Sequence, residues 1–268
     1  MSWPERPSDP DVQRLALPSG ALAFTDEGEG TTVLAIHGLP GSRFDFRYLA
    51  PATPRSRFLR VDLPGFGDSP ADSCGPTAAA HAALLVEALD ALDVGGVALL
   101  AHSFGAGIAA HLAHQLGDRA RGLALLAPAG MHPHNVLRHQ RAVRALGAAA
   151  RAPGLGWGVG HALVPAYRAI GFKRASAAEA RRTFAVVGGW DWGATQQVAA
   201  ELRARGLPAL VAYAADDPIV EAPRMHAWAE ALGSEPLTFA SGGHTVQKTC
   251  ATEIGAALMP WLERLPVS

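Results

Sequence analysis

The chain has 268 residues, of which 49% are hydrophobic and 18% charged, and its formal net charge is -1. This length is enough to bury a large core in one α/β domain, with or without an insertion. A net charge so close to zero provides no long-range field to attract a polyanion, which argues against a nucleic-acid partner. The two cysteines, Cys74 and Cys250, stand far apart and in no metal-binding spacing, so neither a disulfide scaffold nor a zinc site is expected.

The first residues lack the basic and apolar stretches of a secretory signal, and no later apolar run is long enough to span a bilayer. We therefore expect a cytoplasmic protein without a membrane partner. The composition gives no indication of the oligomeric state.

The hydrophobic pattern predicts strands and helices that alternate along most of the chain. Two short strands at 13–17 and 21–25, separated by a Pro-Ser-Gly turn, are typical of a hairpin. Further strands are predicted at 32–36, 58–62, 97–101, 122–126, 209–213 and 236–239, and helices at 77–92, 104–116, 224–232 and 249–262. Because continuous apolar runs are typical of parallel strands buried on both faces, we predict an α/β fold with a mostly parallel, doubly wound sheet of about eight strands.

The pattern changes between residues 131 and 205, where Ala- and Arg-rich helical segments are broken by glycine and proline. We predict a helical cap from 131 to 205, inserted into a core made of 1–130 and 206–268. Aromatic residues in such a segment more often form a small core of its own than contact a substrate. The candidates for the substrate pocket are Phe44, Trp157, Trp190 and Trp192.

Several predicted strands end in loops that carry chemically useful side chains. Ser103 lies between small residues, where an apolar strand stops and a helix begins, a setting that holds a serine in a strained and accessible turn. The sequence His-Gly-Leu-Pro-Gly begins at His37, Asp217 follows a later strand, and His244 follows the last one. In a parallel sheet these loops meet at the carboxyl ends of the strands, where ligands bind.

These residues, in this order, resemble the α/β-hydrolase family over residues 13 to 262, and within it the capped serine hydrolase branch, which is esterase-like. Ala101 replaces the first glycine of the usual Gly-x-Ser-x-Gly elbow. The resemblance implies that Ser103 is the nucleophile and that His244 is its base. It also implies an oxyanion hole made by the backbone N–H groups of Leu39 and Phe104.

The carboxylate that orients the histidine has two candidates, Asp216 and Asp217. Family members commonly show Gly-x-x-Asp at this strand end, often followed by proline. Ala214 replaces that glycine here, and Asp217 precedes Pro218, so Asp217 is favoured and Asp216 is interpreted as a turn residue. The spacing of His132 and His134 is weak evidence for a metal, and we expect no metal and no cofactor.

The expected function is cleavage of a carboxylic ester, or of a related acyl bond such as a lactone or thioester, in a small and fairly apolar molecule. Similar capped enzymes that act on haloalkanes or epoxides use an aspartate nucleophile, a role for which Ser103 is not suited. Carbon-carbon bond hydrolases and perhydrolases of the family share the same three residues and stay open as alternatives. A non-catalytic small-molecule-binding protein on this scaffold is a further alternative.

Overall fold

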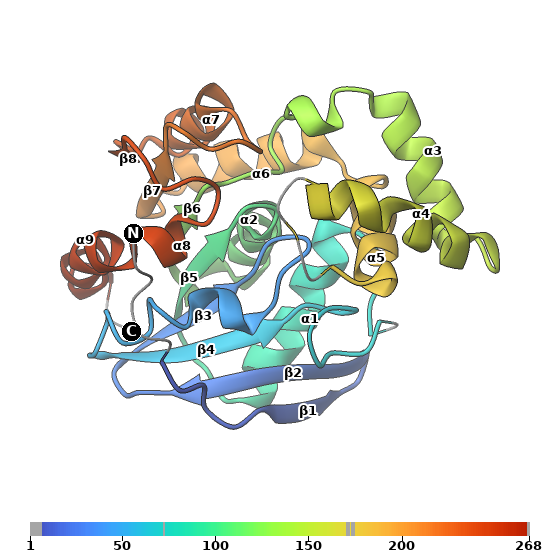
Figure 1. Ribbon diagram of the computed structural model, residues 1–268. Coiled ribbons are helices and arrows are strands. Elements are labelled where there is room, and N and C mark those ends of the chain that lie inside the picture. Colours follow the sequence, from blue (N-terminus) through green and yellow to red (C-terminus); the bar gives the residue numbers. More distant parts are fainter. Residues whose placement is uncertain (1–6, 72, 170–171, 173–174, 267–268) are drawn as a thin grey trace.

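An eight-stranded sheet runs through the middle of the protein, which we describe from a computed structural model (Figure 1). The structure describes residues 7–266 except 72, 170, 171, 173 and 174, so 1–6 and 267–268 of the predicted core lie outside the described residues. The strands are β1 (Gln13–Leu17), β2 (Gly20–Glu27), β3 (Thr31–Ile36), β4 (Ser56–Asp62), β5 (Val97–His102), β6 (Ala120–Leu126), β7 (Ala209–Ala214) and β8 (Leu237–Phe239).

The strand order is β1-β2-β4-β3-β5-β6-β7-β8. β1 and β2 form the predicted antiparallel hairpin and β2 pairs antiparallel with β4, whereas all the other neighbours are parallel. Every residue of β5 is buried, as expected for an apolar central strand covered on both faces. The predicted fold class is therefore confirmed.

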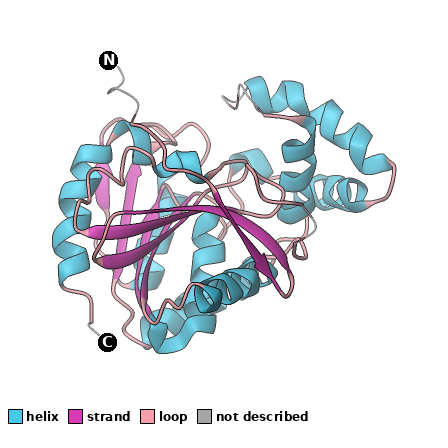
Figure 2. Cartoon of the chain, turned by 90° about the horizontal axis from the view of Figure 1, so that it is seen from below, coloured by secondary structure: helices cyan, strands magenta, loops and turns pink. Residues whose placement is uncertain are grey.

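Helices cover both faces of this sheet (Figure 2). The helices α1 (Ala78–Ala91), α2 (Gly105–Leu116), α6 (Trp192–Ala204) and α7 (Ala222–Leu232) pack in succession, each against the next. The last predicted helix, at 249–262, corresponds to α9 (Ala251–Glu263), and a short helix, α8 (Val246–Thr249), precedes it. Thr77 caps α1, because its hydroxyl accepts a hydrogen bond from the Ala80 amide at 3.1 Å.

The remaining helices stand away from the sheet, on the side where the strands end (Figure 1). They are η3 (Asn135–Leu137), α3 (Gln140–Arg151), α4 (Leu155–Ala169) and α5 (Ala177–Val187). Two further short helices, η1 (Arg43–Phe46) and η2 (Gly117–Arg119), come earlier in the chain. Tyr167, Ala175 and Ala180 form a small core of their own in this region, separate from the main core. We call α3, α4 and α5 the cap helices. The residue boundaries of the predicted cap stay a prediction, and α6 packs with the helices that cover the sheet.

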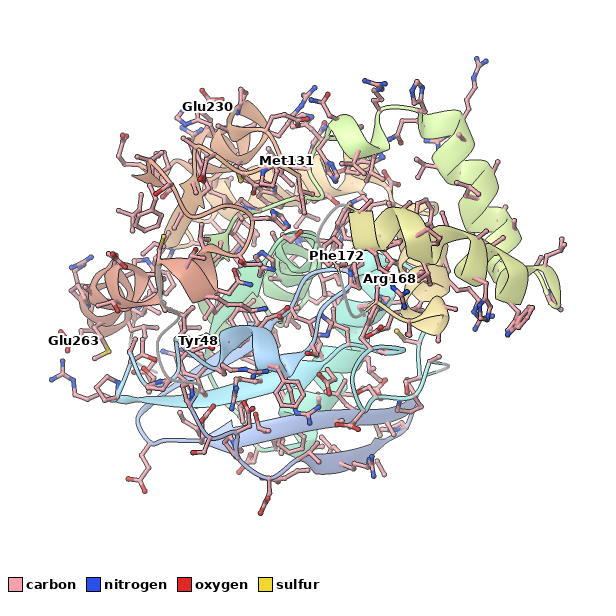
Figure 3. The ribbon with its side chains drawn as sticks, viewed as in Figure 1. Tyr48, Met131, Arg168, Phe172, Glu230 and Glu263 are labelled. Atoms are coloured by element: carbon pink, nitrogen blue, oxygen red, sulfur yellow. The ribbon has the colours of Figure 1, made fainter. Side chains whose placement is uncertain are left out.

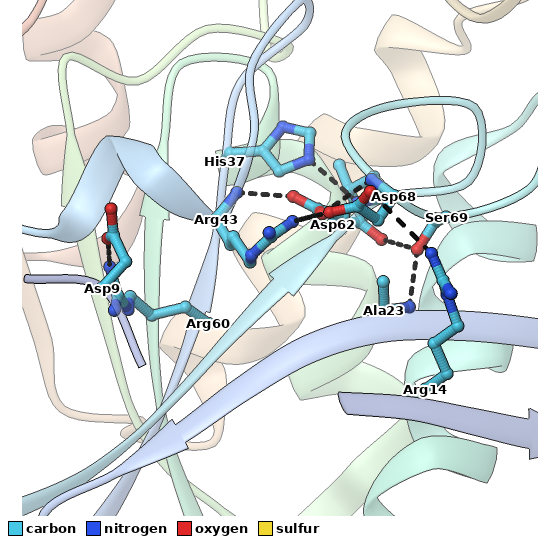
Figure 4. A network of polar contacts seen from close by, with 10 residues as sticks. Asp9, Arg14, Ala23, His37, Arg43, Arg60, Asp62, Asp68 and Ser69 are labelled. Atoms are coloured by element: carbon cyan, nitrogen blue, oxygen red, sulfur yellow. Dashed lines mark hydrogen bonds and ion pairs between the residues drawn. The ribbon is translucent and has the colours of Figure 1, made fainter. Parts of the chain in front are cut away.

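A polar network joins the loops that follow β3 and β4 (Figure 4). The fully buried Asp62 accepts hydrogen bonds from the amides of Arg43 at 2.7 Å and Asp68 at 2.9 Å, and it pairs with the Arg43 guanidinium. His37 contributes its Nε2, which accepts the amide hydrogen of Leu63 at 2.9 Å. These bonds satisfy buried polar groups and fix the loops behind the end of β5.

Candidate active site

Ser103 stands on the turn between β5 and α2 with a φ of 53°, a left-handed conformation that is unusual for a serine. The surrounding contacts impose this strain: the Ser103 amide donates to the Leu126 carbonyl at 3.0 Å, and the Ser103 carbonyl accepts from Ala129 at 3.0 Å. A Cβ atom at Gly105 would collide with backbone oxygens of Ile36 and His37, so the turn requires glycine there. The predicted strained elbow is confirmed.

Three side chains from distant parts of the sequence meet at this turn. The Nε2 atom of His244 lies 3.0 Å from the Ser103 hydroxyl, and its Nδ1 atom lies 2.7 Å from a carboxylate oxygen of Asp217. The other carboxylate oxygen of Asp217 accepts the amides of Ile219 at 2.8 Å and Val220 at 3.0 Å. The chain thus holds a hydroxyl, an imidazole and a carboxylate in one hydrogen-bonded line, which can move a proton from the hydroxyl to the imidazole.

The electrostatics of Asp217 suit this arrangement. Burial by itself would raise the pKa of the Asp217 carboxyl, but the hydrogen bond and charge of His244 and the amides of Ile219 and Val220 outweigh burial and keep the pKa below its usual range. A carboxylate that stays ionised holds the proton of the imidazole on Nδ1. The Nε2 atom is then free to accept the serine proton.

Asp216, the alternative carboxylate, has a different partner. One of its oxygens accepts the amides of Gly242 at 2.9 Å and Gly243 at 2.8 Å, in the loop that leads to His244. The φ angles of these glycines, 158° and 63°, are open to glycine and costly for other residues. Asp216 therefore shapes the histidine loop, while Asp217 contacts the imidazole.

His102 supports the same loop from the other side. Its Nε2 atom lies 2.8 Å from the His244 carbonyl, and the two rings lie 4.9 Å apart. Burial, together with the nearby His244, lowers the pKa of His102 to about 3, so the ring is neutral and donates its Nε2 hydrogen to that carbonyl. This contact gives His102 a structural role beside His244.

Leu39 and Phe104 both border the space in front of Ser103, as the resemblance implies. Leu39 follows β3, and Phe104 directly precedes α2, whose first turn presents backbone N–H groups. Trp190 packs edge-on against the Phe104 ring at 4.9 Å and donates its indole hydrogen to the Gly130 carbonyl at 2.7 Å. The role of the two amides in an oxyanion hole stays a prediction.

A cavity of about 160 Å³ opens from Ser103 toward the cap helices. In the part of the chain that the structure describes, its lining holds no Asp, Glu, Lys or Arg. The apolar residues that line it are Leu39, Phe104, Val136, Leu137, Leu163, Ala166, Phe172, Phe184, Val187 and Ile219. The polar residues that line it are Ser103, His134, Tyr167, Thr183 and His244. Burial lowers the pKa of His134 to about 4, so this wall residue is neutral as well.

None of the four predicted pocket residues lines this cavity. Trp157 is 72% exposed on α4 and stacks on His161, so it belongs to the outer face of the cap. Trp190 and Trp192 lie behind Phe104, where the Trp192 indole donates to the Gln140 side chain at 3.0 Å. Phe44 lines a second, open groove beside His244.

Leu163 and Tyr167, which do line the cavity, were available from the helical pattern. Gly156, Gly160, Leu163 and Tyr167 share one face of α4, a spacing that Trp157 does not fit. The predicted candidates did not include Tyr167, Phe172 or Phe184, which line the cavity. Figure 3 marks Phe172 between the cap helices and the strand-end loops.

In the described residues we find no group of three or more His, Cys, Asp or Glu side chains that could hold a metal ion. No helix in the same part of the chain is long and apolar enough to cross a membrane.

Comparison with known proteins agrees with this fold. The sequence profile of the alpha/beta hydrolase fold matches residues 31–249. A haloalkane dehalogenase from Mesorhizobium japonicum is 32% identical over 119 residues, which is 44% of this chain and 38% of that protein. The dihydrolipoyllysine-residue acetyltransferase component of an acetoin cleaving system from Cupriavidus necator is 33% identical over 38% of this chain and 28% of its own length. The matches thus span less than half of these curated relatives.

Two solved structures resemble nearly the whole chain. Haloalkane dehalogenase DbeA from Bradyrhizobium elkani has a TM-score of 0.75 and 20% identity, covering 95% of this chain and 98% of that one. A thermophilic esterase from Thermogutta terrifontis has a TM-score of 0.73 and 20% identity, with the same coverage. Fold and profile together define the class: the chain belongs to the alpha/beta hydrolase fold family.

Proposed function

We propose that this protein is a serine hydrolase that cleaves a carboxylic ester, or a related acyl bond, through an acyl-enzyme intermediate. The observation that supports this function most strongly is the hydrogen-bonded line of Ser103, His244 and Asp217 at the mouth of an apolar cavity. The similar proteins include both haloalkane dehalogenases and an esterase, so the comparison does not decide which of these activities this chain has. The serine on the elbow favours acyl transfer.

In the proposed reaction, the Ser103 oxygen attacks the carbonyl carbon while its proton moves to Nε2 of His244. The oxyanion formed on the carbonyl oxygen is stabilised by the N–H groups of Leu39 and Phe104. As the carbon-oxygen bond to the alcohol breaks, His244 returns the proton to the leaving oxygen. Water then attacks the acyl group with His244 again as the base, which releases the acid and restores Ser103.

Short p-nitrophenyl esters test the proposal, with Ser103→Ala as the matched variant. We expect turnover to fall by at least about 10⁴-fold in this variant, because the nucleophile is lost while the fold is kept. A fluorophosphonate probe should label the unaltered chain on Ser103. An active, purified Ser103→Ala protein contradicts the proposal.

The same purified protein should be tested for halide release from haloalkanes and for cleavage of a vinylogous diketone. Rapid carbon-carbon cleavage with negligible ester turnover favours the carbon-carbon hydrolase alternative. Absence of labelling together with tight binding of a small molecule favours the binding-protein alternative.

A further inference from the structure

The space around His244 is divided into two compartments of different character. The apolar cavity described above is one of them. The other is an open groove of about 630 Å³, bounded by the loop after β3, by η1, by α8, and by Phe172, Ala175 and Glu179. His244, Ile219 and Phe172 line both compartments and so form the boundary between them.

Ser103, Leu39 and Phe104 line only the apolar cavity. On the proposed mechanism, the carbonyl carbon must lie within reach of Ser103, with its oxygen toward the Leu39 and Phe104 amides. The acyl group attached to that carbon therefore extends into the apolar cavity. The leaving oxygen must face Nε2 of His244 to receive its proton, and beyond His244 lies the groove.

The volume of the cavity limits the acyl group. An apolar protein cavity of about 150 Å³ accommodates one benzene molecule. The present cavity, at about 160 Å³, has walls of leucine, valine and phenylalanine, with no Asp, Glu, Lys or Arg among its described lining residues. A group of about six carbons fits this space, whereas an ionised group would lose its hydration without gaining a counter-charge.

The groove has a different wall. Its floor holds the pair of Lys248 and Asp45, with 2.7 Å between the ammonium nitrogen and a carboxylate oxygen. Burial alone would raise the pKa of Asp45, but Lys248, His102 and His37 outweigh it and hold the pKa below its usual range, so the pair is ionised. Arg47 and Glu179 add one charge of each sign. The described wall is thus polar with balanced charge, which suits a neutral hydroxyl-bearing group better than an ion or a hydrocarbon.

We propose that the substrate is an ester of a small apolar acyl group, up to the size of a benzoyl or hexanoyl group, with a neutral alcohol that carries further hydroxyl groups. The acyl group occupies the cavity, and the alcohol occupies the groove beside the Lys248 and Asp45 pair. This inference rests on the proposed function, since it uses the roles of Ser103 and His244.

The acyl half is tested with p-nitrophenyl esters of acetate, butanoate, hexanoate, benzoate, octanoate and decanoate. We expect kcat/KM to be highest from butanoate to hexanoate and for benzoate, and to be about tenfold or more lower for decanoate. Two cavity variants should move this limit in opposite directions. Phe184→Ala should raise the ratio of decanoate to butanoate turnover by about tenfold, and Leu163→Phe should lower the turnover of hexanoate relative to acetate.

Trp157→Ala is the matched control, because it removes an aromatic side chain from a cap helix without touching the cavity. Its acyl preference should equal that of the unaltered chain. Melting temperatures identify a variant that has lost its fold. If Phe184→Ala does not fold, Leu163→Phe still tests the size limit of the cavity. A flat profile, a rising profile, or cavity variants that behave like the control contradict the proposed acyl site.

The alcohol half is tested with three butanoate esters, those of glycerol, pentanol and choline. We expect the glycerol monoester to have the highest kcat/KM, by about tenfold over the other two. Preference for pentanol or choline contradicts the neutral polar groove. If neither turnover nor fluorophosphonate labelling depends on Ser103, the proposed function itself fails. If both depend on Ser103 while acyl length and alcohol make no difference, only the substrate inference fails.

Discussion

The two sides of Ser103 are built on different physical principles. Behind it, polar groups fix the loops: Asp62 and Arg43 join two strand ends, and Asp216 holds the histidine loop through backbone amides. In front of it, the cap helices present leucine, valine and aromatic side chains around a cavity. Directional bonds on the first side fix angles between reacting groups, whereas apolar packing on the second side selects shape and size. Substitutions should therefore affect rate on one side and preference on the other.

The largest expected effect comes from the paired aspartates. Asp217→Asn should lower kcat by about 10⁴-fold, because an amide cannot hold the imidazole in the tautomer that accepts the serine proton. Asp216→Asn keeps an acceptor oxygen for Gly242 and Gly243 and should stay within about tenfold of the unaltered kcat. Steady-state kinetics on one p-nitrophenyl ester measure both. A larger loss in Asp216→Asn than in Asp217→Asn would reverse the two roles.

The polar network behind the site should dominate stability. Asp62→Ala leaves two backbone amides without their acceptor and removes one of the two carboxylates that pair with the buried Arg43 guanidinium, and we expect the free energy of unfolding to fall by about 3–5 kcal/mol. Asp26, which pairs with Arg57 near the surface, is the matched control. Asp26→Ala should cost about 1 kcal/mol or less. Urea unfolding measures both, and equal losses would show that burial of the network does not matter.

The tryptophans separate support of the elbow from surface packing. Trp190→Phe removes the hydrogen bond to the buried Gly130 carbonyl and loosens the contact with Phe104, so we expect a loss of about 1–2 kcal/mol in unfolding free energy. Trp157→Phe changes an exposed ring and should stay within about 0.5 kcal/mol. Thermal unfolding compares the two. A larger loss of unfolding free energy in Trp157→Phe than in Trp190→Phe would show that the outer face of the cap contributes more to stability than the contacts of Trp190.

Acid should weaken the fold through its buried neutral histidines. Burial lowers the pKa of His81 to about 4, of His102 to about 3 and of His134 to about 4. The unfolded chain binds protons at these residues near pH 6.5, whereas the folded chain does not, so stability is full above that pH and falls as the pH drops toward 4.

Each such histidine contributes up to about 1.4 kcal/mol per pH unit within that window. His81→Gln should reduce the slope of unfolding free energy between pH 6 and pH 4.5 by up to that amount. His114, which is half-exposed on α2, provides the matched variant His114→Gln, which removes a histidine that is not buried. An unchanged slope in His81→Gln would contradict the burial argument.

The sequence predicted the sheet well because each strand is an apolar run with its own turn signals. It also predicted which residues meet, since Ser103, Asp217 and His244 all follow strands of one parallel sheet. The cavity wall was predicted poorly. Each cap helix has two apolar faces, one that packs in the core of the cap and one that faces the cavity. Composition does not show which large residue lies on which face. By composition alone Trp157 was therefore as suitable as Phe184, whereas the spacing of residues along α4 places Trp157 on a different face from Leu163 and Tyr167.

The bond between the Trp190 indole and the Gly130 carbonyl has a consequence for how this protein can be altered. It joins the loop after β6 to the residues before α6, which packs on α2, so the two ends of the intervening segment lie close together. Segments whose ends lie close together are well tolerated as insertions. We therefore expect the intervening helices to be exchangeable as a unit. A chimera that keeps Gly130 and Trp190 but carries another cap should retain the fold of the sheet, and its choice of acyl group should follow the donor of the cap.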